Sequence, residues 1–174
     1  MSDTAQDASR LHIEPLGKTH DRAAFSCGVP ALDRYLQKQA GQDAQRYAAA
    51  PFVLCEGDSP AVLGYYTLSA ISIDVGKLPD ETARKLPRYP EIPATLIGRL
   101  AVDQHRRGER LGEFLLMDAL CRSLRQAGEI AAAAVVVDAK DDRARRFYEA
   151  YDFQIFPDRP DQLFLPMAAV KKLF

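Results

Sequence analysis

Apolar and polar positions along the chain follow two periods, that of strands and that of helices. Runs that alternate, or that stay apolar without a break, predict strands at 11–16, 52–55, 62–73, 95–102, 130–139 and 163–170. Apolar residues at helical spacing predict helices at 30–40, 80–86, 113–127 and 142–151, with a further helix or an extended loop at 42–50. Asp141 or Asp142 can cap the helix at 142–151. Tyr65 and Tyr66 are neighbours in one strand, so their side chains should lie on opposite faces and at most one of them lines a site.

The order of these elements predicts an α/β fold. Residues 52–55 and 62–73 form a hairpin around a turn at 57–60, because glycine and proline cluster between the two runs. Residues 130–139 are apolar without alternation, which is typical of a strand covered on both faces. We therefore expect a mixed α/β sheet with helices on both faces.

Length and composition limit the number of domains. With 174 residues, 47% of them hydrophobic, the chain is long enough for one compact domain and too short for two. We expect this domain at 11–174, after a flexible tail of small and polar residues at 1–10.

Charge and cysteine content exclude several classes of protein. A formal net charge of −1 excludes a protein that coats nucleic acid through bulk charge, so an RNA contact needs a local basic patch. Cys27, Cys55 and Cys121 are odd in number and far apart, which favours a reduced chain over a disulfide framework or a zinc site, and we expect no metal. Cys27 is expected to be a small buried residue rather than a nucleophile. No signal core or membrane-length apolar run is present, so we expect a cytoplasmic protein without a membrane segment.

Residues 95–112, TLIGRLAVDQHRRGERLG, lead from a strand through a charged turn into a helix. The first N–H groups of a helix have no intrahelical partner and carry the positive end of the helix dipole, so such a turn can hold a phosphate. Gly108 and Gly112 leave room for a pyrophosphate. Three arginines add positive charge around it: Arg106, Arg107 and Arg110. The alternative is an ordinary strand-to-helix loop with solvated basic side chains.

Two segments resemble the acetyl-CoA signature of the GNAT acetyltransferase superfamily. In RLAVDQHRRGERLGEFLLMDAL, the stretch from Arg107 to Gly112 fits the phosphate turn, except that Arg110 stands where the first glycine is usual. DDRARRFYEAYDF matches the later pattern N-x-x-A-x-x-[LF]-Y, with Asp141 in place of asparagine and Asp152 in place of a usual glycine. The resemblance implies a single-domain GNAT fold with a mostly antiparallel sheet, and acetyl-CoA as the acetyl donor.

The same resemblance assigns roles to residues of this chain. Tyr148 is similar to the general acid of the superfamily, and a phenol with an ordinary pKa of about 10 is protonated at neutral pH and able to donate to a leaving thiolate. The alternative role of Tyr148 is structural, as an aromatic side chain of a helix that packs on the sheet. The backbone at Leu100–Val102, where the strand splays from its neighbour in this family, would polarise the thioester carbonyl. The residues expected to bind acetyl-CoA are Leu100, Ala101, Val102, Arg107, Gly108, Glu109, Arg110, Leu111, Gly112, Asp141 and Arg145.

A narrower resemblance covers nearly the whole chain. FSCGVPALDRYLQKQAGQD, FVL, YYTLS, LPRYPEIPATLIGRLAVD and LFLPM are similar to passages of the acetyltransferase toxins of bacterial toxin–antitoxin pairs. This resemblance implies that the chain acetylates the α-amine of aminoacyl-tRNA and blocks translation, that a ribbon-helix-helix antitoxin neutralises it, and that it forms a homodimer. An α-amine has a pKa of about 7.7–8.0, which esterification lowers further, so no strong enzymic base is required.

Contacts to tRNA are expected from basic residues of the proline-rich loop at 77–93, beside the reaction centre and on the helix of Tyr148, although a solvated charged loop explains the same residues. The candidates are Lys77, Arg84, Lys85, Arg88, Arg99, Arg143, Arg145 and Arg146. Two other functions stay open: a GNAT enzyme acting on a small amine or a protein N-terminus, and a non-catalytic CoA- or RNA-binding module. A P-loop hydrolase is disfavoured, because no Gly-Lys-Ser/Thr ends the turn.

Overall fold

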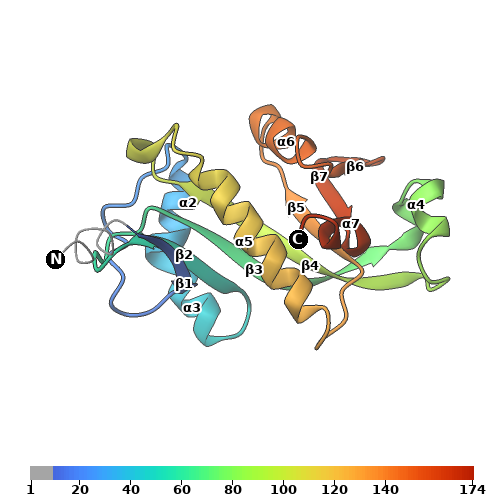
Figure 1. Cartoon of the computed structure of the whole chain (residues 1–174), viewed down its shortest axis with the longest axis horizontal. Coiled ribbons are helices and arrows are strands. Elements are labelled where there is room, and N and C mark those ends of the chain that lie inside the picture. The colour runs from blue at the N-terminus through green and yellow to red at the C-terminus, as the bar shows by residue number, and fades with distance from the viewer. Residues whose placement is uncertain (1–9) are drawn as a thin grey trace. The chain divides into compact units, whose positions relative to one another are not determined.

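The computed structural model describes residues 10–174 of the chain (Figure 1). Its strands are β1 (Leu11–Pro15), β2 (Ala50–Glu56), β3 (Gly64–Asp74), β4 (Glu91–Val102), β5 (Ala134–Asp138), β6 (Gln154–Phe156) and β7 (Arg159–Pro166). Its helices are α2 (Pro30–Arg34), the π-helix η1 (Tyr35–Gln39), α3 (Ala40–Gln45), the 3-10 turns η2 (Val75–Lys77) and η3 (Gln104–Arg106), α4 (Asp80–Arg84), α5 (Leu111–Gln126), α6 (Asp142–Glu149) and α7 (Met167–Lys171). The tail predicted at 1–10 lies, apart from Arg10, outside the described residues.

The described strands form one seven-stranded sheet in the order β1-β2-β3-β4-β5-β7-β6. β4 and β5 run parallel, whereas β1–β2, β2–β3, β5–β7 and β6–β7 are antiparallel. The expected mixed, mostly antiparallel sheet is therefore confirmed. Val135, Val136 and Val137 of β5 are fully buried, which explains why this strand shows no alternation in the sequence.

Within this fold the contacts group the residues into two compact units. The described part of the first unit comprises 10–68 and Arg99–Asp118, and the second comprises Ser69–Gly98 and Ala119–Phe174. β3, β4 and α5 each contribute residues to both units.

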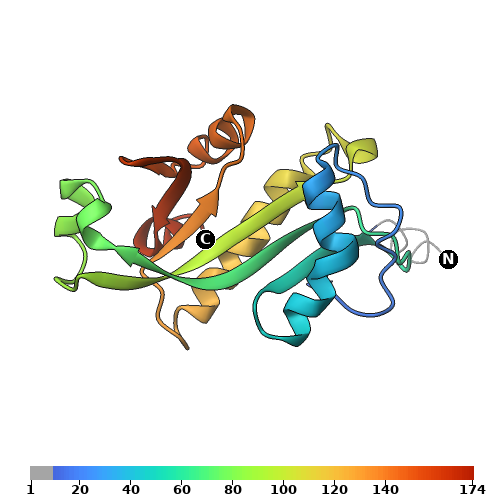
Figure 2. The ribbon, with the colours of Figure 1, turned by 180° about the vertical axis from the view of Figure 1, so that it is seen from behind.

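In the first unit, α2, η1 and α3 form one continuous helical segment beside β2 and β3 (Figure 2). Pro30 occupies its first turn, as the sequence predicts. Tyr35 and Leu36 bury the inner side of the segment. The separate helix or loop predicted at 42–50 is wrong, because α3 continues this segment to Gln45 and β2 already begins at Ala50.

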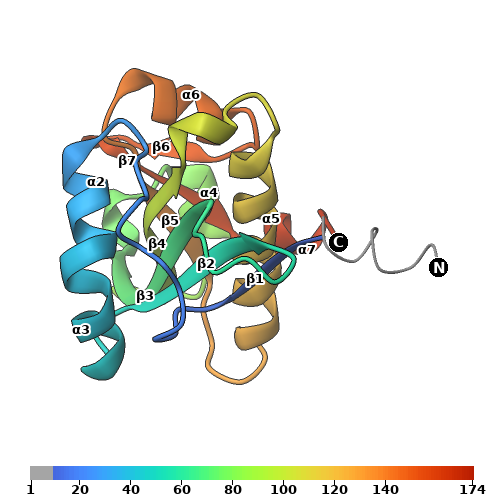
Figure 3. The ribbon, with the colours of Figure 1, turned by 90° about the vertical axis from the view of Figure 1, so that its left-hand side faces the viewer.

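The strands of the first unit separate two helical layers, α2 and α3 on one face and α5 on the other (Figure 3). Tyr65 donates a hydrogen bond from its hydroxyl to the carbonyl of Leu32 in α2, at 2.7 Å. Tyr66, the next residue, donates to the carboxylate of Asp118 in α5. The expected opposite orientation of the two tyrosines is confirmed, and both rings are fully buried.

In the second unit, α4 lies in the connection between β3 and β4 (Figure 1), and the helix predicted at 80–86 is confirmed. Phe156 and Phe164, from β6 and β7, contact each other with ring centroids 4.9 Å apart. They belong to a buried cluster that also contains Ile92 and Val136. Among the described residues, no helix has the length and apolar character needed to cross a bilayer.

Near the C-terminal end one prediction fails and one strand was missed. The strand predicted at 163–170 ends at Pro166, and Met167–Lys171 is helix α7. Proline has no N–H to donate to the ladder, and here it stands at the N-cap of the helix. β6 was not predicted, because three residues are too few to show a period.

Candidate functional site

The turn between η3 and α5 is built on two residues with left-handed backbones. Gly108 has a φ of +84° and Arg110 a φ of +58°. Apart from its chain neighbours, no described heavy atom lies within 4 Å of the place where a Cβ on Gly108 would stand, so this side of the turn is open. Leu111, 3% exposed, begins α5 and fixes the turn to the core. The first N–H groups of α5 thus follow directly on an open turn, which suits an anion.

Arg110 has the left-handed backbone that glycine adopts most readily. A left-handed backbone costs a residue with a Cβ about 1–2 kcal/mol. The turn therefore displays a charged side chain at a position whose backbone conformation favours glycine. Arg110 is exposed, so its charge can meet an anion from solvent.

The other two arginines of this turn are held by the chain itself. Arg106 donates through Nε and Nη2 to Glu109, at 2.6 and 2.9 Å, and through Nη1 to Glu56, at 2.8 Å. These hydrogen bonds raise the pKa of Arg106 and lower that of Glu109. Arg107 donates from Nη2 to the carbonyl oxygen of Cys27 at 3.2 Å. Two carboxylates thus offset the charge of Arg106, whereas the neutral partner of Arg107 leaves its charge uncompensated.

A loop before α2 is fastened to the same turn, which the sequence did not indicate. Gly28 has a φ of +90°, and a Cβ there would stand 2.9 Å from Nη2 of Arg107. Asp103 accepts the backbone N–H of Ser26 at 3.2 Å and that of His105 at 2.9 Å. Burial alone would raise the pKa of Asp103, but the hydrogen bonds from His105 and Ser26 hold it below its usual value. The ionised Asp103 therefore anchors both the loop and the start of η3.

Leu100–Val102 forms the last part of β4. β4 pairs with β5 at Thr95–Ile97, and in that register β5 ends, at Asp138, before it reaches Leu100. The splay expected at this point stays a prediction. A Cβ on Gly64 would stand 2.9 Å from the carbonyl oxygen of Ala101, so the close approach of β3 requires glycine.

Arg99 is stacked on an aromatic ring of the first unit. Its Cζ lies 3.5 Å from the centroid of the Tyr35 ring, which in turn stacks on Tyr65 with centroids 6.2 Å apart. The Tyr35 hydroxyl donates to Asp43 at 2.8 Å, and burial followed by this hydrogen bond raises the pKa of Tyr35 to about 12. The guanidinium of Arg99 is thus oriented by the face of the Tyr35 ring. Neither Tyr35 nor Asp43 was singled out from the sequence.

The two polar residues of α6 expected at acetyl-CoA have partners within their own helix. Asp141 is the N-cap, and its carboxylate accepts the N–H of Ala144 at 2.8 Å, which is a capping role also predicted from the sequence. Arg145 forms ion pairs with Asp142 and, at 3.8 Å, with Glu149. The arginine side chain is therefore held along the helix surface.

Tyr148 is 4% exposed and contacts the rings of Phe147 and Phe153, with centroids 5.2 and 5.5 Å away. Burial, and then the charge of Asp138, raise the pKa of its phenol above the ordinary value. The hydroxyl therefore stays protonated at neutral pH and can serve as a proton donor. This geometry agrees with both interpretations, a general acid and a packed aromatic. Asp152, after α6, has a φ of +69° at the second position where glycine is usual.

The remaining basic candidates for tRNA contact are exposed, around α4 and on α6: Lys77, Arg84, Lys85, Arg88, Arg143 and Arg146. Within the described part of the chain, none of these side chains takes part in an ion pair. The acidic residues of α4, Asp80 and Glu81, lie in its first turn, where their negative charge interacts favourably with the positive end of the helix dipole. The basic charge of the loop is thus free to attract an anion.

No protein-family profile matches the chain, but several curated proteins are similar to it, among them the following two. A probable toxin TacT of Sinorhizobium fredii is 34% identical over 174 residues, which cover 95% of this chain and 96% of that protein. A tRNA-acetylating toxin of Mycobacterium tuberculosis is 37% identical over 153 residues, which cover 88% of this chain and 90% of that protein.

Solved structures of toxins have the same fold. A tyrosine-to-phenylalanine mutant of KacT matches with a TM-score of 0.88 and 28% identity, covering 94% of this chain and 99% of that one. AtaT complexed with acetyl-methionyl-tRNAfMet matches with a TM-score of 0.87 and 27% identity, covering 95% and 99%. A mutant of AtaT bound to the C-terminus of the antitoxin AtaR and to acetyl-CoA matches with a TM-score of 0.80 and 25% identity, covering 94% and 98%.

Proposed function

Because the chain belongs to the GNAT family of tRNA-acetylating toxins, we propose that it transfers the acetyl group of acetyl-CoA to the α-amine of an aminoacyl-tRNA and thereby blocks translation. The observation that carries the proposal is the similarity, over nearly the whole chain, to a toxin solved with an acetylated aminoacyl-tRNA. The open glycine turn before α5 and the protonated Tyr148 support it independently.

In this proposal, the turn at Arg107–Gly112 binds the pyrophosphate of the donor. The N–H groups at the start of α5 and the side chains of Arg107 and Arg110 supply the positive potential, and Gly108 lets the phosphates approach the backbone. Glu109 contributes through its backbone, because its carboxylate is engaged by Arg106. The backbone of Leu100–Val102 binds the pantetheine arm and polarises the carbonyl.

Acetyl-CoA, when bound, supplies the thioester from which the acetyl group is transferred. The neutral α-amine attacks the carbonyl carbon, a C–N bond forms and the C–S bond breaks, and the amine loses one proton to water. Tyr148 donates its phenolic proton to the departing thiolate, which offsets the charge that develops on sulfur, and the phenolate then regains a proton from solvent. The raised pKa keeps the phenol protonated throughout the neutral range, but it also makes the phenol a weaker acid.

The acceptor is held by basic side chains in this proposal. Lys77, Arg84, Lys85 and Arg88 around α4 contact the phosphate backbone, and Arg99 is pre-oriented by Tyr35. The proposal also covers a ribbon-helix-helix antitoxin, a homodimer and action in the cytoplasm. A similar toxin solved with the C-terminus of its antitoxin supports an antitoxin partner.

The proposal is tested by incubating the purified chain with labelled acetyl-CoA and three acceptors: an aminoacyl-tRNA, the same free amino acid and a peptide that begins with it. We expect label on the aminoacyl-tRNA alone, recovered as an N-acetyl amino acid after the ester is hydrolysed. Equal labelling of the free amino acid or the peptide would instead identify a general amine acetyltransferase. Binding of acetyl-CoA without release of CoA in any reaction would identify a non-catalytic module.

Reversing the charge of Arg84, Lys85 and Arg88 to Glu should raise the KM for aminoacyl-tRNA by about tenfold or more, because counterion release is lost with each phosphate contact. The slope of log KM against log salt should fall by about 0.7–0.9 for every contact removed. The matched control reverses Lys171 and Lys172, which are exposed in the same unit. A KM equal to that of the control would remove the α4 loop from tRNA binding.

A further inference from the structure

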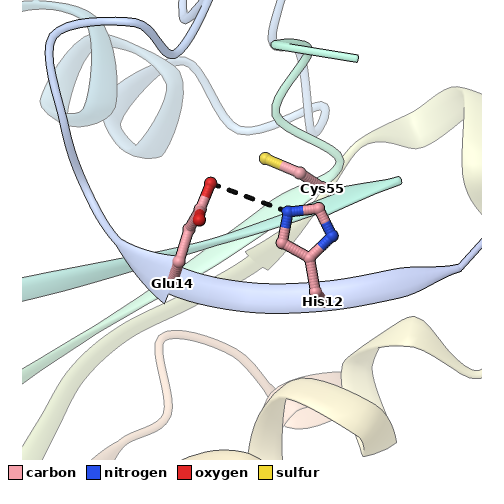
Figure 4. Close-up of side chains that lie close together, drawn as sticks. All are labelled: His12, Glu14 and Cys55. Carbon is pink, nitrogen blue, oxygen red and sulfur yellow. Dashed lines mark ion pairs between the residues drawn. The ribbon is translucent and has the colours of Figure 1, made fainter. Parts of the chain in front are cut away.

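Three side chains with metal-binding atoms converge on one side of the edge strand β1 (Figure 4). His12 and Glu14 are two residues apart in β1, so their side chains project from the same face. Cys55 of β2 is the register partner of His12. One nitrogen, one carboxylate oxygen and one sulfur of these residues all lie within 4.8 Å of one another. The His12 Nε2 to Glu14 Oε1 distance is 3.6 Å.

A second histidine fixes the carboxylate of this cluster. Nε2 of His20 lies 2.7 Å from Oε1 of Glu14, and its Nδ1 accepts the backbone N–H of Gly17 at 2.9 Å. Because Nδ1 is an acceptor, the neutral ring carries its proton on Nε2 and donates it to Glu14. The His20 side chain is only 6% exposed, so this orientation is built into the fold of the loop after β1.

We propose that His12, Glu14 and Cys55 form a binding site for a divalent transition metal of the zinc type, with His20 orienting Glu14. Imidazole nitrogen, thiolate sulfur and carboxylate oxygen are the donors that zinc takes, and three protein ligands leave its fourth position to water. Calcium and magnesium are excluded by this donor set, because they require oxygen ligands. In such sites a further residue usually holds a metal ligand in place by a hydrogen bond, as His20 holds Glu14.

Binding at this site exchanges a proton for the metal. Metals bind the thiolate form of cysteine, so the Cys55 thiol must give up its proton. The metal takes the place of that proton: one S–H bond breaks, one sulfur–metal bond forms, and one H⁺ is released to solvent. The affinity should therefore fall as the pH is lowered.

The site departs from the expectation that the cysteines hold no zinc. The sequence could not indicate it, because the ligands come from two strands whose register is set only by folding. Its consequence is structural: the metal would join β1, the outermost strand on this side of the sheet, to β2 and, through His20, to the following loop. The inference does not depend on the proposed acetyl transfer.

The test uses the whole purified chain, stripped of metal with a chelator and titrated with Zn²⁺ by calorimetry and with Co²⁺ by absorption spectroscopy. We expect one equivalent to bind, a thiolate-to-cobalt charge-transfer band with the d–d bands of a low-coordinate ion, and a raised unfolding temperature. Cys55→Ser should abolish the charge-transfer band, and His20→Ala should weaken binding by about 10–100-fold.

Two further variants make the test decisive. His12→Ala removes a partly exposed side chain, so it should retain the fold while the bound equivalent is lost. Cys121→Ser, a partly buried cysteine outside the cluster, is the matched control and should bind as the natural chain does. Absence of saturable binding to the folded chain, or an unchanged cobalt band in Cys55→Ser, would overturn the proposal.

Discussion

The turn at Arg107–Gly112 and the segment from α6 to Phe153 resemble the two parts of one superfamily signature, and each has another residue where the pattern usually has glycine. In both, that residue has a left-handed backbone, with a φ of +58° at Arg110 and +69° at Asp152. The residues differ in what this conformation costs them. Aspartate is among the non-glycine residues that are several-fold enriched in the left-handed region, whereas arginine is not.

This difference indicates which substitution depends on its side chain. Asp152 stands just after a helix, and its N–H donates to the carbonyl of Glu149 at 3.0 Å, so a C-terminal turn explains it without further function. Arg110 precedes a helix, is exposed and bears a charge where we propose that a pyrophosphate binds. The strain at Arg110 is therefore best understood as the cost of that charge.

The largest effect that separates the two segments is expected at Tyr148, in α6. Tyr148→Phe should lower kcat by about 10²–10⁴-fold, because a general acid is lost, and leave the KM for acetyl-CoA unchanged. The rings of Phe147 and Phe153 still pack on the phenylalanine, so the unfolding temperature should change little. Steady-state kinetics measures kcat and KM, and calorimetry measures the unfolding temperature. Tyr151→Phe is the control, and a kcat equal to the control value would assign Tyr148 to packing alone.

A smaller effect is expected at the turn, where a substitution should change the stability and the KM for acetyl-CoA but not kcat. Arg110→Gly should raise the free energy of unfolding by up to about 1 kcal/mol, because the left-handed strain is relieved and part of that gain is lost to the flexible unfolded chain. The KM for acetyl-CoA should rise a few-fold as the charge is removed, with kcat unchanged. Arg110→Lys retains both charge and strain and should resemble the natural chain. If the KM of Arg110→Gly stays constant, the charge of Arg110 serves another ligand.

The smallest effect is expected at Asp152. Asp152→Gly should change the free energy of unfolding by no more than about 0.5 kcal/mol and leave both kinetic constants unaltered, because aspartate tolerates the left-handed region. Asp152→Ala is the informative comparison, since alanine lacks this tolerance and should destabilise the chain. Chemical denaturation of the three proteins measures the series. A gain at Asp152→Gly as large as that at Arg110→Gly would remove the distinction between the two positions.

Features encoded over short stretches could be predicted from the sequence. The helix after Pro30, the cap at Asp141 and the buried valines of β5 follow from local chemistry, and all three appear in the structure. Arg110 and Asp152 were recognised as departures from a pattern, but their left-handed backbones are visible only in the structure.

Contacts between distant segments could not be predicted. The hydrogen bond from Arg107 to the carbonyl of Cys27 forms only once the chain has folded. The same holds for the pairing of Cys55 with His12 between β2 and β1. The same limit applies to Arg99, whose partner Tyr35 lies far away in sequence. The strand predicted at 163–170 fails for a different reason, since the apolar residues after Pro166 fit either a strand or a short buried helix.

The crowding at Gly64 predicts which mutations would inactivate this protein in cells that survive its production. A Cβ at this position would stand 2.9 Å from both the carbonyl oxygen of Ala101 and Cδ1 of Leu115, so neither backbone nor core can yield to any larger residue. When the gene is induced without an antitoxin, survivors should carry missense changes at codon 64 more often than at codon 128, where the nearest atom is 3.6 Å away. Sequencing the gene in the survivors would measure how often missense changes occur at each of the two codons.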